Sequence, residues 1–162
     1  MNPLIIIDMQ SEYEITESKP LLNNIIKHIQ RAIKRKNPVI IVELRDMGLT
    51  KPEIMNALSG YSNYETVIKD KEDGSKEIQN ILLKRWDIQK CLVNVCGIFS
   101  DDCIAYTVRG LIDKGFSVNV IEEACASSQN DHESAMWSLN KLRKCQVVHQ
   151  GPAYRNGPIY KY

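Results

Sequence analysis

The chain has 162 residues, of which 43% are hydrophobic and 25% charged, and its formal net charge is +1. This length and composition predict one globular domain and exclude a disordered or fibrous protein. The near-neutral charge argues against nucleic acid or an anionic membrane as the main partner. No apolar run approaches the roughly 20 residues that span a bilayer.

The first ten residues, "MNPLIIIDMQ", differ from a secretory signal because no basic region precedes the apolar stretch, which meets Asp8 after four residues. The five cysteines are an odd number and too sparse for a disulfide scaffold. Together these features predict reduced thiols in a cytoplasmic protein.

Short apolar runs alternate with helical patterns along the chain. Strands are predicted at 4–7, 39–44, 66–68, 91–98, 117–121 and 146–148. Helices are predicted at 21–33, 77–85, 103–114 and 133–144, with a further helix possible between the second and third strands. Several strands are apolar nearly throughout, as expected when both faces of a sheet are covered. With right-handed crossovers, this order predicts an α/β protein with three α/β/α layers and an open, mostly parallel, Rossmann-like sheet of about six strands.

The pattern contains no linker or internal repeat, so residues 1–162 are predicted to form a single domain. Residues 149–162, "HQGPAYRNGPIYKY", form a tail rich in glycine, proline and tyrosine. This tail is either an irregular surface segment or an arm that packs on a neighbouring subunit.

Two polar residues follow predicted strands at the edge where open α/β sheets gather functional groups. Asp8 follows four apolar residues, so partial burial would raise the pKa of its carboxyl group and make it a better base; a turn or capping role is the alternative. Lys69 could pair with a carboxylate or stabilise developing negative charge. However, Lys71 is two residues away, and surface lysines are common.

Cys103 follows the fourth predicted strand in "GIFSDDC" and falls in the first turn of the next helix, where Ser100, Asp101 and Asp102 offer capping side chains. The helix N-terminus would lower the pKa of the Cys103 thiol, and its free N–H groups could form an oxyanion hole. A small packing residue is the alternative. Cys96 lies within the strand, where a buried thiol is inert.

Other chemistries lack their motifs. The sequence has no G-x-G-x-x-G, G-x-x-x-x-G-K-[ST], G-x-S-x-G or C-x-x-C, which argues against a phosphate-binding loop, a dinucleotide or flavin site, a serine-hydrolase elbow and a dithiol or zinc site. His28 is expected on the exposed face of the first helix, and His132 is expected as an exposed capping residue. A Cys103–His132 pair is the fallback nucleophile and base.

Four segments together resemble the isochorismatase-like cysteine hydrolases, a family that includes nicotinamidase-related amidohydrolases. They are "LIIIDMQ", "VIKDKEDGS", "VCGIFSDDCIAYTVRGLIDKGFSVNVIEEAC" and "DHESAMWSL", and the likeness runs from Leu4 to about Leu142. The family pattern is an apolar strand ending in D-x-Q, a strand-end lysine, and G-x-x-T-D-x-C-V-x-x-T followed by G-x-x-V. The most specific part matches at Gly97, Asp101, Cys103, Thr107, Gly115 and Val118.

The resemblance implies a catalytic triad of Asp8, Lys69 and Cys103. Lys69 is preferred to Lys71 because similar members place the lysine five residues before a glycine, here Gly74. The resemblance also implies that the protein needs no cofactor and forms a homo-oligomer.

The resemblance further implies a cis peptide bond between Ile98 and Phe99, and an oxyanion hole made by the backbone N–H groups of Phe99 and Cys103. Three features depart from the family pattern, and one of them is Ser75, which stands where many members have an aromatic residue lining the pocket. Nicotinamidases bind a metal through an Asp and several histidines near the second strand, whereas "ELRDMGLTKPE" offers Asp46 and no histidine, so no metal site is predicted. Ser100 replaces the usual threonine. Phe99 replaces a smaller residue and is expected to narrow the entrance to the active-site pocket.

We therefore expect a cysteine hydrolase that cleaves a carbon–nitrogen bond, of amide or ureido type, in a small molecule through a thioester on Cys103. The thiol favours this chemistry because members that hydrolyse the vinyl ether of isochorismate do not need a thiol nucleophile. Two alternatives stay open, a non-catalytic member acting as a binding or assembly module and an isochorismatase-type hydrolase of a non-amide substrate. Substrate-binding residues are not identified from the sequence.

Overall fold

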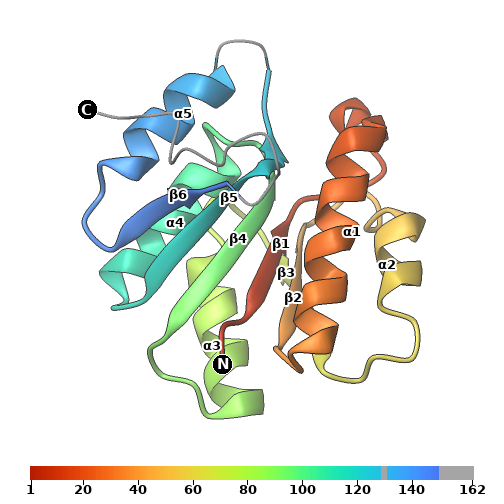
Figure 1. The fold of residues 1–162 in the computed structure, drawn as a ribbon, viewed down its shortest axis with the longest axis horizontal. Helices are drawn as coiled ribbons and strands as arrows, with labels where there is room; N and C mark the ends of the chain where they lie inside the picture. Colours follow the sequence, from red (N-terminus) through yellow and green to blue (C-terminus); the bar gives the residue numbers. More distant parts are fainter. Residues whose placement is uncertain (129–130, 150–162) are drawn as a thin grey trace.

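The structure is a computed structural model that describes residues 1–128 and 131–149. Its six strands form one parallel sheet in the order β3-β2-β1-β4-β5-β6 (Figure 1). The strands are β1 Leu4–Ile7, β2 Val39–Leu44, β3 Tyr64–Lys69, β4 Leu92–Ile98, β5 Ser117–Ala126 and β6 Cys145–Val148. The helices are the 3-10 helix η1 Glu14–Glu17, α1 Lys19–Lys34, α2 Pro52–Ala57, α3 Ser75–Trp86, α4 Cys103–Asp113 and α5 Asp131–Asn140.

The helices form the two outer layers. Helices α1 and α2 pack against each other on one face of the sheet, and α3 and α4 pack against each other on the opposite face (Figure 1). Helix α5 packs on β5 and β6. The predicted three-layer α/β/α architecture with an open Rossmann-like sheet is confirmed, and the strand order reverses at the β1–β4 pair, where such sheets place their sites.

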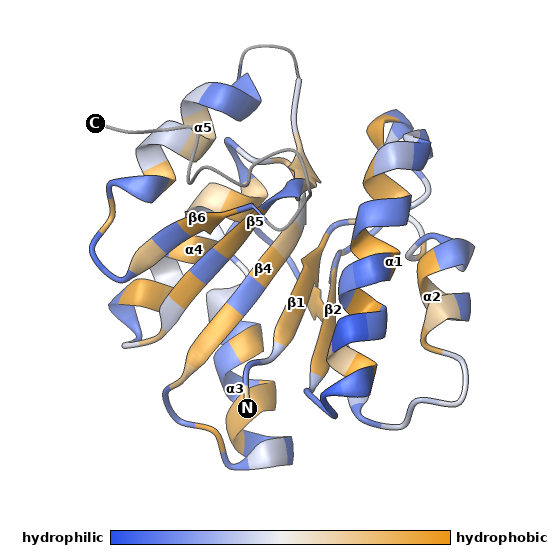
Figure 2. Ribbon diagram, viewed as in Figure 1, coloured by the Kyte–Doolittle hydropathy of each residue, from blue (hydrophilic) through white to orange (hydrophobic). Residues whose placement is uncertain are grey.

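The apolar runs of the sequence form the centre of this sheet. All four residues of β1 are buried, and β1 lies between β2 and β4 with helices on both sides, which is why it has no polar alternation (Figure 2). Helix α1 instead buries one stripe, including Leu22, Ile25 and Ile29. Its first turn is stabilised by the Ser18 side chain, which accepts a hydrogen bond from the Leu21 N–H at 3.4 Å.

The predicted element boundaries differ from the structure mainly in β5 and α5. Strand β5 continues five residues beyond the predicted 121, because Cys125 and Ala126 keep pairing with β4 after a register shift. Helix α5 ends at Asn140 rather than at 144. The tail predicted at 149–162 lies outside the described residues except for His149. Within the described part of the chain, no helix has the length and apolar character needed to cross a membrane.

A glycine lets the two central strands meet closely beside the site. Gly97 has a φ of +121°, and a Cβ atom built there would lie 2.1 Å from the carbonyl oxygen of Ile7. These two residues pair across β1 and β4. Any side chain at position 97 would therefore separate the strands that carry Asp8 and Cys103 at their ends.

Candidate active site

Three side chains from three strand ends meet at the carboxyl edge of the sheet. Asp8 follows β1, Lys69 ends β3, and Cys103 opens α4 after β4. The Lys69 Nζ lies 3.0 Å from the Asp8 Oδ2. The Asp8 carboxyl group and the Cys103 thiol are near enough for each to affect the pKa of the other. Asp8 and Lys69 are 0% exposed and Cys103 is 4% exposed, so the three groups interact largely out of water.

Asp8 is held by the backbone of the loops around it. Its φ of 56° turns the chain sharply after β1, and its N–H donates to the Val42 carbonyl at 2.9 Å. The side chain of Gln10, the last residue of the D-x-Q pattern, donates to the carbonyls of Leu44 and Gly48 at 2.8 Å each and accepts from the Leu44 N–H at 2.8 Å. Gln10 therefore ties the segment after β1 to the end of β2 and to the loop that follows it.

Lys69 is positioned by the loop that follows it. Its Nζ donates to the Glu72 carbonyl at 2.8 Å, and Gly74 leaves room for its aliphatic stem, since a Cβ there would lie 3.1 Å from the Lys69 Cδ. The buried hydroxyl of Thr107, on α4, accepts from the Gly74 N–H at 3.0 Å and donates to the Glu72 carbonyl at 3.3 Å. Lys71 is exposed, so Lys69 is the lysine that the fold brings to Asp8.

The turn before Cys103 has an unusual backbone. The Ile98–Phe99 peptide bond is cis, and the Phe99 carbonyl accepts hydrogen bonds from the N–H groups of Asp102 and Ile104 at 3.2 and 3.0 Å. The N–H of Cys103 belongs to the first turn of α4, where N–H groups have no partner within the helix. The two residues expected to form an oxyanion hole, Phe99 and Cys103, thus lie at the two ends of this turn.

The polar side chains of this turn do not cap the helix as predicted. Asp102 occupies the N-cap position but its side chain makes no cap hydrogen bond. The Asp101 carboxylate accepts from the Ser127 hydroxyl, and the Ser100 hydroxyl is 2.7 Å from the His132 Nδ1. These side chains bond to the segments that follow β5, because the extended β5 brings those segments alongside the turn.

Burial and charge set the proton affinities of the site. Burial raises the pKa of the Asp8 carboxyl group, an effect that the neighbouring Lys69 ammonium partly offsets. This direction agrees with the prediction of a stronger base. Neither Asp8 oxygen accepts a well-aligned hydrogen bond from the described residues, so the contact with Lys69 is an ion pair and the carboxylate can still receive a proton.

The predicted lowering of the Cys103 pKa is wrong. Burial, followed by the hydrogen bond and negative charge of Asp8, raises the pKa of the Cys103 thiol to about 12, although the Lys69 ammonium acts in the opposite direction. These effects outweigh the helix N-terminus. At neutral pH the resting Cys103 is therefore a protonated thiol.

An aromatic pair lies beside the thiol. The rings of Tyr13 and Phe99 meet edge to face, with centroids 5.4 Å apart and an interplanar angle of 87°. Burial and the charges of Asp8 and Cys103 raise the pKa of Tyr13 to about 12. No sequence motif singles out Tyr13, because its position depends on the fold of the loop after β1.

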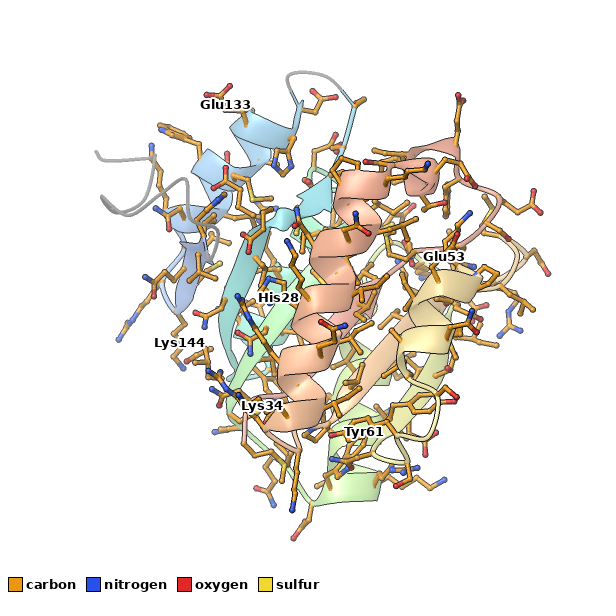
Figure 3. All side chains as sticks on the ribbon, turned by 45° about the vertical axis from the view of Figure 1, so that its right-hand side comes forward. His28, Lys34, Glu53, Tyr61, Glu133 and Lys144 are labelled. Carbon is orange, nitrogen blue, oxygen red and sulfur yellow. The ribbon has the colours of Figure 1, made fainter. Side chains whose placement is uncertain are left out.

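The histidines behave differently from the prediction. His28 lies on α1 (Figure 3) and is buried rather than exposed, with its Nε2 3.0 Å from the Glu123 Oε1 of β5. His132 is partly buried and lies against Ser100, so the fallback Cys103–His132 pair is not the arrangement that the structure has. Both differences arise from contacts with segments distant in sequence.

No metal site of the nicotinamidase type was expected, because the loop after β2 contains Asp46 but no histidine. In the structure, Asp46 adopts a left-handed backbone conformation with a φ of 65°. In the part of the chain that the structure describes, no three His, Cys, Asp or Glu side chains are grouped closely enough to hold a metal ion.

Comparison with known proteins identifies the family. The isochorismatase domain model matches residues 2–150, so the chain belongs to the isochorismatase family. "Isochorismatase domain-containing protein 2" of Xenopus laevis is 30% identical over 149 residues, which cover 87% of this chain and 67% of the relative. Family membership supports a hydrolase.

Solved structures share the fold at low sequence identity. The MAR1 ribonuclease of Caenorhabditis elegans superimposes with a TM-score of 0.77 at 21% identity, covering 91% of this chain and 76% of that chain. A nicotinamidase from Staphylococcus aureus gives a TM-score of 0.74 at 19% identity, covering 91% and 98% of the two chains. At these identities the structural likeness establishes the fold alone.

Proposed function

We propose that the protein is a cysteine hydrolase that cleaves a carbon–nitrogen bond, of amide or ureido type, in a small molecule. The observation that carries this proposal is the buried ion pair of Asp8 and Lys69 at the strand ends, together with the buried Cys103 thiol that opens α4 at the same edge of the sheet. A thiol nucleophile and a neighbouring general base are the groups that nucleophilic acyl transfer uses, and a cation can stabilise the charged form of the base.

In the first half of the reaction, Asp8 takes the thiol proton as the Cys103 sulfur attacks the substrate carbonyl carbon. The carbonyl oxygen becomes an oxyanion, which the backbone N–H groups of Phe99 and Cys103 stabilise. The tetrahedral intermediate then collapses, the carbon–nitrogen bond breaks, and protonated Asp8 returns its proton to the leaving nitrogen. Ammonia or an amine departs, and the acyl group remains on the sulfur as a thioester.

In the second half, Asp8 takes a proton from water, which attacks the thioester carbonyl. The carbon–sulfur bond breaks, Asp8 gives its proton to the sulfur, and the acid product leaves. Lys69 stabilises the carboxylate form of Asp8 whenever the proton is elsewhere. Because the resting Cys103 is a protonated thiol, proton transfer to Asp8 accompanies attack rather than preceding it.

The alternatives make different use of the same residues. A binding or assembly module has no need of a buried thiol within reach of a buried carboxylate. A hydrolase of a vinyl ether would use Asp8 but not the sulfur. The buried thiol of Cys103 at the same strand-end edge as the Asp8–Lys69 pair therefore favours the amidohydrolase. All five cysteines are free, which suits a reducing compartment such as the cytoplasm.

The test is ammonia release from a panel of small amides, ureas and carbamoyl compounds. We expect at least one compound to be hydrolysed, and the Cys103→Ala variant to be inactive. The Cys96→Ala variant is the matched control, because Cys96 is also a buried cysteine but lies within β4 rather than at the start of α4. Hydrolysis that survives in Cys103→Ala would support the vinyl-ether type of mechanism, and silence across the whole panel would support the non-catalytic module.

A further inference from the structure

A polar cavity lies toward the opposite end of the central strands from the candidate active site. Its volume is about 130 Å³, and it lies between helix α1 and the first halves of strands β1, β4 and β5. Leu4, the first residue of β1, and Asn94, near the start of β4, line it. Asp8 and Cys103 follow the carboxyl ends of the same two strands, so the cavity is separate from the active site.

The sheet side of the cavity is a polar row in strands that are otherwise apolar. Leu4, Asn94 and Asn119 are paired neighbours on β1, β4 and β5, and all three line the cavity. Strands covered by apolar layers on both faces read as nearly continuous apolar runs. Asn94 and Asn119 interrupt such runs, as the hydrophilic bands within β4 and β5 show (Figure 2). This face of the sheet is therefore built to meet polar groups.

The helix side of the cavity carries positive charge. His28, Arg31 and Arg35 recur at spacings of three and four residues, which places them on one face of α1, and all three line the cavity. The His28 ring is paired with the Glu123 carboxylate, which lies 3.0 Å from its Nε2. Among the described residues that line the cavity, none is an aspartate or a glutamate. The lining thus supplies two permanent positive charges from arginine and no negative charge.

The asparagines of the lining offer hydrogen-bond donors. The Asn119 Nδ2 donates to the Asn94 Oδ1 at 3.3 Å, and the backbone N–H of Asn2 donates to the Asn37 Oδ1 at 3.4 Å. Because these bonds engage the side-chain oxygens of Asn94 and Asn37, their NH₂ groups are what the two side chains have for a ligand. Guanidinium and amide donors on different elements match a ligand that has acceptor oxygens in several directions.

We propose that this cavity binds a phosphate group, either free or in a small phosphate ester. Arg31 and Arg35 supply the charged donors, and the NH₂ groups of Asn94 and Asn37 supply the neutral ones. A tetrahedral phosphate suits donors on several sides better than a planar carboxylate does. Both arginines are exposed, so the organic part of an ester extends past them into solvent. The site takes no part in the hydrolysis proposed above and does not depend on it.

The proposal can be tested by titration calorimetry with inorganic phosphate and with glycerol 3-phosphate at constant ionic strength. We expect saturable binding, with shifts of the side-chain NH₂ signals of Asn94 and Asn37 in nitrogen-15 NMR spectra. Tighter binding of glycerol 3-phosphate would identify a phosphate ester as the ligand class, and tighter binding of inorganic phosphate would identify the free ion. Acetate should bind about tenfold more weakly than either.

Variants locate the binding. Arg35→Gln should weaken phosphate binding about tenfold, because a charged donor is lost. Asn94→Asp should abolish binding, because it keeps the shape of the side chain and replaces the NH₂ group with a negatively charged oxygen. Lys34→Gln is the matched control, since it removes the same charge from the neighbouring exposed position, which does not line the cavity, and it should change the affinity less than about twofold.

Three results would each overturn the proposal: no saturable phosphate binding, equal losses in Arg35→Gln and Lys34→Gln, or loss of binding in Cys103→Ala, which would place the phosphate in the active site. Arg35→Gln changes an exposed side chain, so it serves as the test even where Asn94→Asp does not fold. Binding is measured without turnover, so a protein that binds phosphate here but hydrolyses no amide would contradict the hydrolase function alone.

Discussion

Replacement of Lys69 by methionine isolates the buried ion pair of the site. Lys69 and Asp8 are both fully buried, and their charged atoms are 3.0 Å apart. Methionine fills much of the volume of the lysine stem but leaves the Asp8 carboxylate without its cation. Breaking a buried pair by removing one partner costs about 3–5 kcal/mol of folding free energy, and we expect a loss of this size at pH 8.

The folding free energy lost in Lys69→Met should increase as the pH rises. Burial already raises the pKa of Asp8 above 3.8, and removal of the Lys69 charge raises it further. A group with a raised pKa in the folded state contributes stability that is present at low pH and is lost as the pH rises through the folded pKa. The difference in unfolding free energy between the native protein and Lys69→Met should therefore widen with pH, by at most about 1.4 kcal/mol per pH unit.

Urea unfolding at a series of pH values from 5 to 8 measures this difference. Lys71→Met is the control, because Lys71 is exposed and its replacement should leave the unfolding free energy unchanged at every pH. Lys69→Met should also lose catalytic activity, whereas Lys71→Met should retain it. A difference that stays constant between pH 5 and pH 8, or a Lys69→Met variant as stable as the native protein at pH 8, would refute the account of this pair.

Three further predictions concern the residues around the triad. Gly97→Ala should destabilise the fold by about 3 kcal/mol or more in thermal unfolding, because its Cβ would lie 2.1 Å from the Ile7 oxygen; a melting temperature within about 2 °C of the native value would contradict this. Thr107→Val should cost about 1–3 kcal/mol in urea unfolding, since the buried Gly74 N–H loses its acceptor, and Thr107→Ser should recover most of that loss. Iodoacetamide at pH 7 should label Cys103 more slowly than a free small thiol, because the pKa of Cys103 is raised to about 12, and faster labelling would contradict the protonated resting state.

Much of the fold could be predicted from local patterns. The apolar run of β1 and the repeating apolar positions of α1 are local sequence patterns that predict a strand and a helix. The preference for right-handed crossovers then predicts a parallel sheet. The end of β5 was missed because its last residues are kept in the sheet by pairing with β4 after a register shift, and Glu122 and Glu123 interrupt its apolar run.

The residues of the candidate site could be predicted from the sequence, but the pKa of Cys103 could not. Asp8, Lys69 and Cys103 end elements that a parallel sheet brings to one edge, so position along the chain was enough to nominate them. The pKa of Cys103 depends on burial and on the distance to Asp8, which no spacing in the sequence reveals. The burial of His28 likewise depends on Glu123, a partner 95 residues away.

Several sequence-based expectations remain predictions. These are the roles of the triad and the oxyanion hole, the homo-oligomer, the cytoplasmic location, and a small molecule rather than nucleic acid or membrane as the partner. The homo-oligomer can be tested by light scattering of the purified chain, where a mass equal to that of one chain would contradict it.

The most direct test of the central claim is the mass of the protein during turnover of an amide substrate. Rapid acid quenching followed by peptide mass spectrometry should reveal the acyl group of that substrate on Cys103, and hydroxylamine should remove it, as expected for a thioester. Turnover by the native protein with no acyl group on Cys103, together with undiminished turnover by Cys103→Ala, would contradict the account.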